Sequence, residues 1–128
     1  MFRRFTFIGL LTLGTVSAWA QGAVHPHHGG QAVRIGKYEV ELTVIGSDLT
    51  LFVLDEKDAP VDSAGLIASA VVLARGNQQK TVEFKPDGEH KLTGKADFPV
   101  DRKFRATVTL KIGSREVGKG RYNMDVGR

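Results

Sequence analysis

Histidine is concentrated at one place in this sequence. Three of its four histidines, His25, His27 and His28, stand within four positions, and the fourth is His90. Imidazole is the most common neutral-pH ligand for Zn²⁺ and Cu²⁺, and it is largely unprotonated near pH 7. Because no helical spacing orients the rings and no fourth ligand stands beside them, His90 or a carboxylate from elsewhere is needed to complete the coordination shell. We therefore predict a Cu²⁺ or Zn²⁺ site with ligands among His25, His27, His28 and His90.

The same cluster is also typical of a solvated tail. Residues 21–30 are polar, contain glycine and proline, and show no apolar periodicity, which indicates a flexible lead before the domain. In that case the histidines only keep the segment extended and accessible. If a metal does bind, Cu²⁺ or Zn²⁺ is favoured over Cu⁺, because the chain has no cysteine and Met124 is its only methionine besides Met1.

The N-terminus has the order of parts that defines a secretory signal peptide. Arg3 and Arg4 are followed by the apolar run 5–16 and by the small-x-small site that ends at Ala20. The apolar run is too short to span a bilayer, and no second one follows, so we expect no membrane span after cleavage. Thr6 fits the twin-arginine pattern poorly, which favours the general secretory route. We predict a signal peptide over 1–20, a flexible His-rich segment over 21–30 and one domain over 31–128.

Composition excludes several classes of protein. Without cysteine there is no disulfide framework and no thiolate metal site. Removal of Arg3 and Arg4 with the signal peptide leaves 16 basic against 14 acidic residues, a net charge of +2. The two signs are interleaved along the chain, and no aromatic and basic platform is present, so nucleic acid is not an expected partner.

Hydrophobic alternation predicts an all-β domain. The alternation is strictest at 38–44 and 104–112, and Gly-containing turns follow both segments. A connection of about a dozen residues, with room for a short helical turn, covers 55–66. About seven strands of this kind must bury their apolar faces against each other, which predicts an immunoglobulin-like β-sandwich. The expected strands are 38–44, 49–54, 67–73, 80–84, 90–93, 104–112 and 116–123, with a further short one near 96–98.

No catalytic motif is recognisable. The serines lack the G-x-S-x-G setting of a nucleophile elbow, and His90 lies in a turn-rich hairpin without a supporting sequence context for a Ser-His-acid arrangement. The acidic residues at 55, 56 and 58 fall in a solvated connection and lack the spacing of a calcium loop. We therefore expect a protein that is not an enzyme.

Four stretches of the sequence, His28-Gly29-Gly30-Gln31, residues 36–42, residues 49–55 and Pro60-Val61-Asp62, resemble a family of small periplasmic proteins of Gram-negative bacteria. These proteins are associated with heavy-metal efflux systems of the resistance-nodulation-division class. The H-G-G-Q entry segment is the distinctive part of the resemblance. It implies a periplasmic accessory role in metal handling, with His28 and its neighbours as the contact and an efflux adaptor as a candidate partner.

Two hypotheses about function follow. The first is a periplasmic protein that binds or passes Cu²⁺ or Zn²⁺ through the His-rich segment. The second is a protein-interaction module whose exposed edge strand pairs with a partner and whose histidines are incidental.

Overall fold

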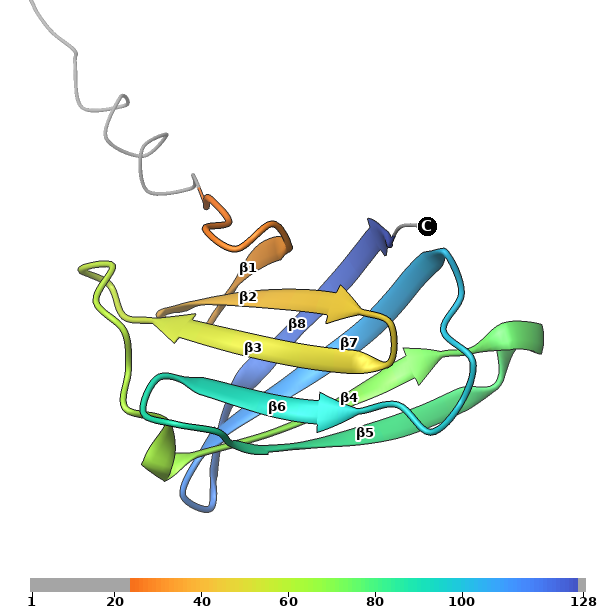
Figure 1. The fold of residues 1–128 in the computed structure, drawn as a ribbon. Helices are drawn as coiled ribbons and strands as arrows, with labels where there is room; N and C mark the ends of the chain where they lie inside the picture. Colours follow the sequence, from red (N-terminus) through yellow and green to blue (C-terminus); the bar gives the residue numbers. More distant parts are fainter. Residues whose placement is uncertain (1–23, 127–128) are drawn as a thin grey trace, which may run out of the picture.

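The structure, a computed structural model, describes residues 24–126. The predicted signal peptide and the first residues of the His-rich segment lie outside these residues. The described chain forms eight strands and two short 3₁₀ turns, η1 (Ser63–Gly65) and η2 (Arg75–Asn77) (Figure 1). The strands are β1 (Gln31–Ile35), β2 (Tyr38–Ile45), β3 (Asp48–Leu54), β4 (Leu66–Leu73), β5 (Gln79–Pro86), β6 (Lys91–Lys95), β7 (Lys103–Ile112) and β8 (Arg115–Asp125).

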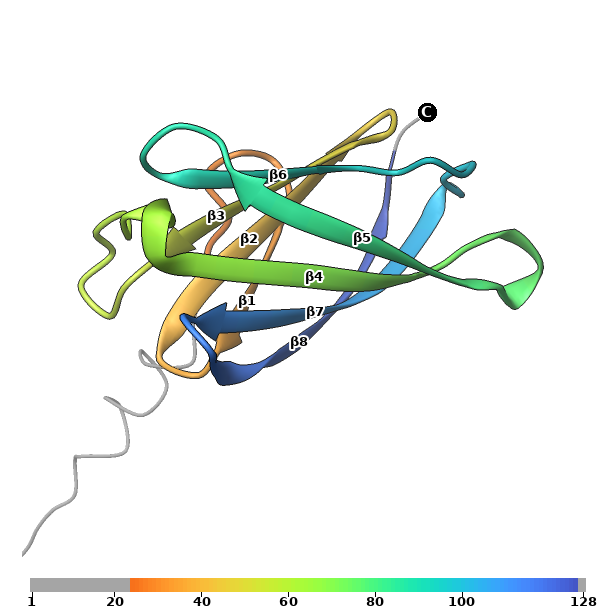
Figure 2. The ribbon, with the colours of Figure 1, turned by 90° about the horizontal axis from the view of Figure 1, so that it is seen from below.

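All eight strands belong to one antiparallel sheet that is nearly closed into a barrel. The strand order is β1-β2-β3-β6-β5-β4-β7-β8. The wall of β1, β2, β3 and β6 faces the wall of β5, β4, β7 and β8, as both views of the ribbon show (Figures 1 and 2). The all-β prediction is confirmed. The immunoglobulin-like sandwich is not confirmed, because a short ladder of β5 with β6 joins the two walls into one sheet.

The barrel is almost sealed where its two end strands meet. β1 and β8 lie side by side but share no backbone ladder within residues 24–126. The backbone N–H of Asn123 donates to the side-chain oxygen of Gln31 at 2.8 Å. Gly120 allows this approach, because a Cβ there would lie 2.8 Å from Cγ1 of Ile35. The register of β8 against β7 shifts at Val117, just before Gly118.

β1 is not among the strands predicted from the sequence, and the short strand predicted near 96–98 does not form. β1 contributes only Val33 and Ile35 to the interior, which is too short an alternation to separate from a polar lead. Residues 96–98 form no strand, although Ala96 is buried and Phe98 packs against the core. The hairpin of β2 with β3, the hairpin of β4 with β5, and the β7–β8 hairpin are all found near their expected places.

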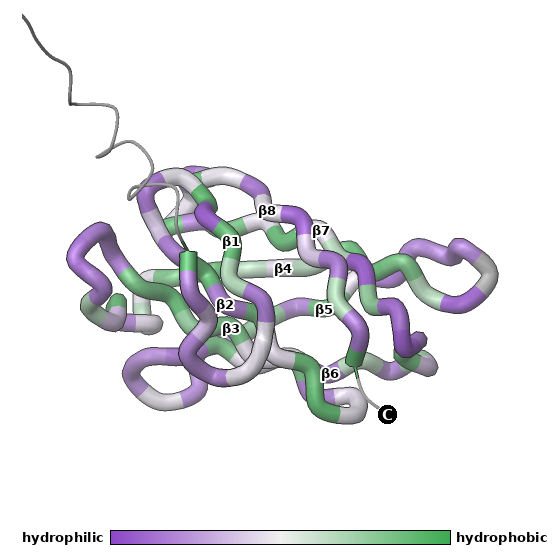
Figure 3. The backbone as a smooth tube through the Cα atoms, turned by 90° about the horizontal axis from the view of Figure 1, so that it is seen from above, coloured by the Kyte–Doolittle hydropathy of each residue, from purple (hydrophilic) through white to green (hydrophobic). Residues whose placement is uncertain are grey.

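The inward residues of every strand fill the barrel. Hydrophobic and hydrophilic residues alternate along the strands, and the connections are mainly hydrophilic (Figure 3). Tyr122 is the largest fully buried side chain, and its hydroxyl donates to the carbonyl oxygen of Val40 at 2.8 Å, across the barrel. Burial, with a smaller contribution from the negative charge of Glu41, raises the pKa of Tyr122. The phenol therefore stays neutral and tethers β8 to β2.

The connection from β3 to β4 is fixed to the turn before β6. The predicted helical turn is present as η1, which Asp62 caps by accepting from the N–H of Ala64. The buried hydroxyl of Ser63 donates to the carbonyl oxygen of Gly88 at 2.8 Å. The backbone N–H of Ser63 donates to the carbonyl oxygen of Glu89. These bonds hold the turn that carries His90 in a defined place. None of the helical segments in residues 24–126 is long and apolar enough to cross a membrane.

Candidate functional site

Two buried carboxylates lie on the outer side of β2. Glu39 and Glu41 alternate with the core residues of this strand and so point away from the barrel interior, yet only 7% and 4% of their surfaces are exposed. The chain before β1 covers them. Burial of a carboxylate is costly unless hydrogen-bond donors replace the lost water.

The His-rich segment supplies those donors from its backbone. Glu41 accepts from the N–H groups of His27 at 2.9 Å, His28 at 2.8 Å and Gly30 at 2.8 Å. Glu39 accepts from the N–H of His25 at 3.1 Å. Residues 25–30 are thus bonded to the sheet.

Two glycines make this docking sterically feasible. Gly29 has a φ of +84°, a conformation that favours glycine, and it turns the segment toward β1. At Gly30 a Cβ would collide with the carbonyl oxygen of Leu42 on β2. The H-G-G-Q stretch therefore has a structural reason, which is to bring the backbone against the carboxylates.

The ring of His28 is held on two sides. It stacks on Phe52 with ring centroids 3.7 Å apart and planes 4° from parallel. Its Nδ1 lies 2.9 Å from Oε1 of Glu41. An ionised carboxylate can only accept, so Nδ1 carries the proton and Nε2 keeps its lone pair. With 46% of its side chain exposed, His28 can present Nε2 to an incoming ligand.

The pKa of Glu41 reflects its surroundings. Burial raises this pKa, but the hydrogen bonds from the His28 ring and from the N–H groups of Gly30, His27 and His28 lower it by more. The net shift is downward, so Glu41 is ionised at and below neutral pH. It therefore accepts from Nδ1 of His28 and fixes the tautomer of the neutral ring.

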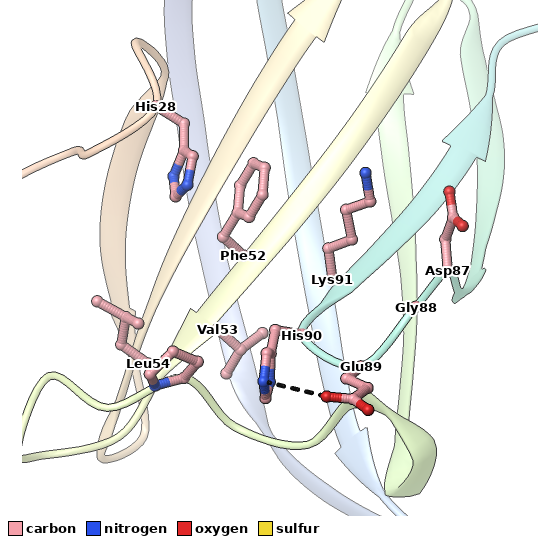
Figure 4. Close-up of a pocket in the computed structure, with 10 residues that line it drawn as sticks. His28, Phe52, Val53, Leu54, Asp87, Gly88, Glu89, His90 and Lys91 are labelled. Atoms are coloured by element: carbon pink, nitrogen blue, oxygen red, sulfur yellow. Dashed lines mark ion pairs between the residues drawn. The ribbon is translucent and has the colours of Figure 1, made fainter.

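A groove of about 310 Å³ runs from His28 to the turn that carries His90. Its lining is mainly apolar and includes Phe52, Val53, Leu54 and Pro60. Lys91 follows His90 along the rim, and the close-up shows His28 and His90 on separate sides of the groove (Figure 4). His90 has 55% of its side chain exposed, and its Nε2 lies 3.7 Å from Oε1 of Glu89.

The predicted ligands are brought together in part. The three clustered histidines border one small hollow with Glu39 and Glu41, and His28 and His90 border the larger groove. Within residues 24–126, no group of three or more His, Cys, Asp or Glu side chains is placed to hold a metal ion. His25 and His27 are both exposed.

Glu39, Glu41 and Phe52 were not among the candidate site residues from sequence. The alternation of β2 assigned both carboxylates to a polar face, without indicating that another segment covers it. One signal was present, because β3 is apolar on both sides: Phe52 and Leu54 alternate with the core residues. A strand that is apolar on its outer side is typical of a covered strand.

No protein-family model matches this chain, and no curated protein or solved structure matches it either.

Proposed function

We propose that this is an exported, non-enzymatic periplasmic protein that binds Cu²⁺ or Zn²⁺ at its docked His-rich segment. In this proposal the chain carries a signal peptide for the general secretory route, and the protein hands its metal to an efflux adaptor or another periplasmic protein. The observation that carries the metal proposal is the contact of His28 Nδ1 with Glu41 at 2.9 Å.

That contact has the arrangement common to metal-bound histidines. A ligating imidazole usually donates its other ring N–H to a carboxylate, which fixes the tautomer, orients the ring and raises the basicity of the ligating nitrogen. Glu41 provides this carboxylate, and the Phe52 ring restricts rotation of the imidazole from the other side. Nε2 of His28 is thus the best prepared ligand in the described chain.

His25 and His27 supply the further nitrogen ligands. Their backbone N–H groups are anchored on Glu39 and Glu41, so both rings stay near His28 while their exposed side chains turn. Rotamer changes of exposed side chains take only picoseconds to nanoseconds. A set of neutral imidazoles suits Zn²⁺ and Cu²⁺, and water or a ligand from a partner takes the remaining position.

The carboxylates support the site without being ligands to the metal. The oxygens of Glu41 already accept from the segment's N–H groups and the His28 ring, so coordination of a metal by them would release the segment. His90 faces the same groove as His28 and is the candidate for a fourth ligand from the domain.

Calorimetric titration with Zn²⁺ and Cu²⁺ tests the proposal. The untagged chain from Gln21 contains every described element and should bind with a micromolar or tighter dissociation constant at pH 7. Binding should weaken strongly at pH 5.5, since imidazoles protonate in that range. A triple His25, His27, His28→Ala variant should lose the binding, and His90→Ala measures the contribution of the fourth histidine. Equal weak heats for the parent chain and the triple variant would refute a metal site here.

A further inference from the structure

A second surface, on the barrel wall away from the His-rich segment, combines positive charge with exposed apolar side chains. It is the outer side of β4, β7 and β8, and we call it the basic face. Register places Val71 beside Thr107 and Thr107 beside Arg121, while Arg105 lies beside Asn123. Arg105 and Arg121 are therefore diagonal neighbours on one side of the sheet.

The two arginines of the basic face are not neutralised. Neither Arg105 nor Arg121 has an ion pair within residues 24–126, and both are exposed. Lys119 on the next row is different, because it lies 3.5 Å from Glu116 and 3.4 Å from the hydroxyl of Thr109. Two adjacent like charges without a counter-charge favour an anionic partner.

A groove of about 310 Å³ lies between the arginines and the apolar part of this face. Val71 and Leu73 border it on one side, and Val71 is 42% exposed. Ile67, on the same side of β4, is 50% exposed. None of the described residues that line the groove is acidic, whereas Gln79, Thr107 and Asn123 add neutral hydrogen-bonding groups.

We infer that the basic face binds an acidic segment of another protein, with carboxylates on Arg105 and Arg121 and apolar side chains on Val71 and Ile67. The planar guanidinium matches a carboxylate bidentately, and arginine is enriched at protein interfaces. The charge pattern favours a protein segment over an anionic membrane. Glu83 and Asp125 lie on the outer side of the sheet near the groove and interrupt its positive charge, so a segment that enters the groove fits this face better than an extended lipid surface.

The basic face and the His-rich segment lie on opposite walls of the barrel, so both can be occupied at once. β4 and β7 lie on the wall opposite β2 and β3, which carry the His-rich segment (Figures 1 and 2). A partner held on the basic face therefore leaves the histidines accessible. This inference does not depend on the proposed metal site, so either can fail without the other.

The test is a titration of ¹⁵N-labelled protein with a short capped peptide built from glutamate, leucine and serine. Amide shifts should centre on Val71, Thr107 and Arg121, and a counterpart peptide with glutamine in place of glutamate should bind at least tenfold more weakly. The Arg105→Gln, Arg121→Gln double variant should also raise the dissociation constant at least tenfold. As matched controls, Lys37→Gln and Lys57→Gln remove two exposed positive charges from connections outside this face. These variants should leave the dissociation constant of the peptide unchanged.

The contrary results are equally specific. Shifts centred on another face, or equal binding of the two peptides, would overturn the inference. So would arginine-dependent binding to phosphatidylglycerol vesicles without peptide binding, since the face would then recognise lipid. Because both arginines are exposed, an unchanged amide spectrum of the double variant verifies its fold. His28→Ala should leave peptide affinity unaltered, which separates this surface from the metal site.

Discussion

At the scale of single residues, Glu41 is the residue on which the candidate site depends. It is 4% exposed, and it joins the backbone of the His-rich segment, the ring of His28 and strand β2. A carboxylate in this position is ionised because its donors outweigh its burial. Substitution of Glu41 therefore tests both the negative charge of its carboxylate and its hydrogen bonds.

Replacing Glu41 by Gln should destabilise the protein and change its response to acid. The amide offers one acceptor oxygen where the carboxylate offered two, so buried N–H groups lose partners, at a cost on the order of 2–4 kcal/mol. The folded pKa of Glu41 lies below the reference value of 4.5, so its stabilisation is full above that value and is lost as the pH falls through the folded pKa. Urea unfolding between about pH 6 and pH 3 should show a weaker pH dependence in the variant.

The exposed Glu56 provides the control for that experiment, because Glu56→Gln removes a carboxylate from the β3–β4 connection. It should reproduce the stability and the pH dependence of the parent chain. If Glu41→Gln and Glu56→Gln behave alike, the carboxylate of Glu41 does not hold the segment.

His28→Phe separates packing from coordination. Phenylalanine can keep the stack on Phe52 but has no nitrogen, so the variant should fold and bind Zn²⁺ at least tenfold more weakly. His27→Phe should have a smaller effect, since within the described chain only His28 has a ring nitrogen bonded to a carboxylate on β2. Titration calorimetry with Zn²⁺ compares the affinities of the two variants. A larger loss from His27→Phe would contradict the special role given to His28.

At the scale of elements, the junction of β1 with β8 depends on a missing side chain. A Cβ at Gly120 would lie 2.8 Å from Cγ1 and 2.9 Å from Cδ1 of Ile35, which is itself buried. Gly120→Ala should therefore lower the free energy of unfolding by about 1–3 kcal/mol, the usual cost of overpacking. Gly65→Ala is the matched control, because nothing lies within 4 Å of its Cβ. Denaturant unfolding compares the stabilities of Gly120→Ala and Gly65→Ala. Equal stabilities would show that the Ile35 side chain moves aside without lowering the free energy of unfolding.

The hairpins were easier to predict from the sequence than the closure of the sheet into a barrel. β2 with β3 and β7 with β8 are local pairs, marked by strict alternation and by glycine turns such as Gly46 and Gly113. Pairing of β5 with β6 is confined to Lys85 and Pro86, so a small ladder decides between two sheets and one. A ladder this short leaves little trace in periodicity, and neither does the approach of β1 to β8, whose residues lie far apart in the sequence.

Only part of the candidate site could be predicted from the sequence. Imidazole chemistry marked the histidines, because three of them stand within four positions. The carboxylates and Phe52 could not be assigned, since their role exists only when residues 25–30 fold back over β2 and β3, a contact across a sequence separation of about fourteen residues. The sheet supplies the partners that orient a sequence-local cluster.

At the scale of the whole molecule, the metal site proposed for the His-rich segment requires that Zn²⁺ or Cu²⁺ bind the folded protein more tightly than the unfolded chain. The three histidines stand within four positions of the sequence, so the unfolded chain can also chelate. Any metal affinity of the unfolded state reduces the stabilisation of the folded state by the metal. What folding adds is the Glu41 contact and the Phe52 stack. Supporting contacts of this type usually change metal affinity 10- to 100-fold.

Thermal unfolding with and without saturating Zn²⁺ measures that preference directly. An affinity ratio of about 10–100 between the folded and unfolded states corresponds to about 1.4–2.7 kcal/mol of added stability. For a domain of this size, each kcal/mol raises Tm by about 4–8 °C. The shift should be reversed by a chelator and should be much smaller in Glu41→Gln. A solvated tail binds metal equally in both states, so binding by calorimetry without any Tm shift would assign the histidines to a tail and remove Glu41 from the site.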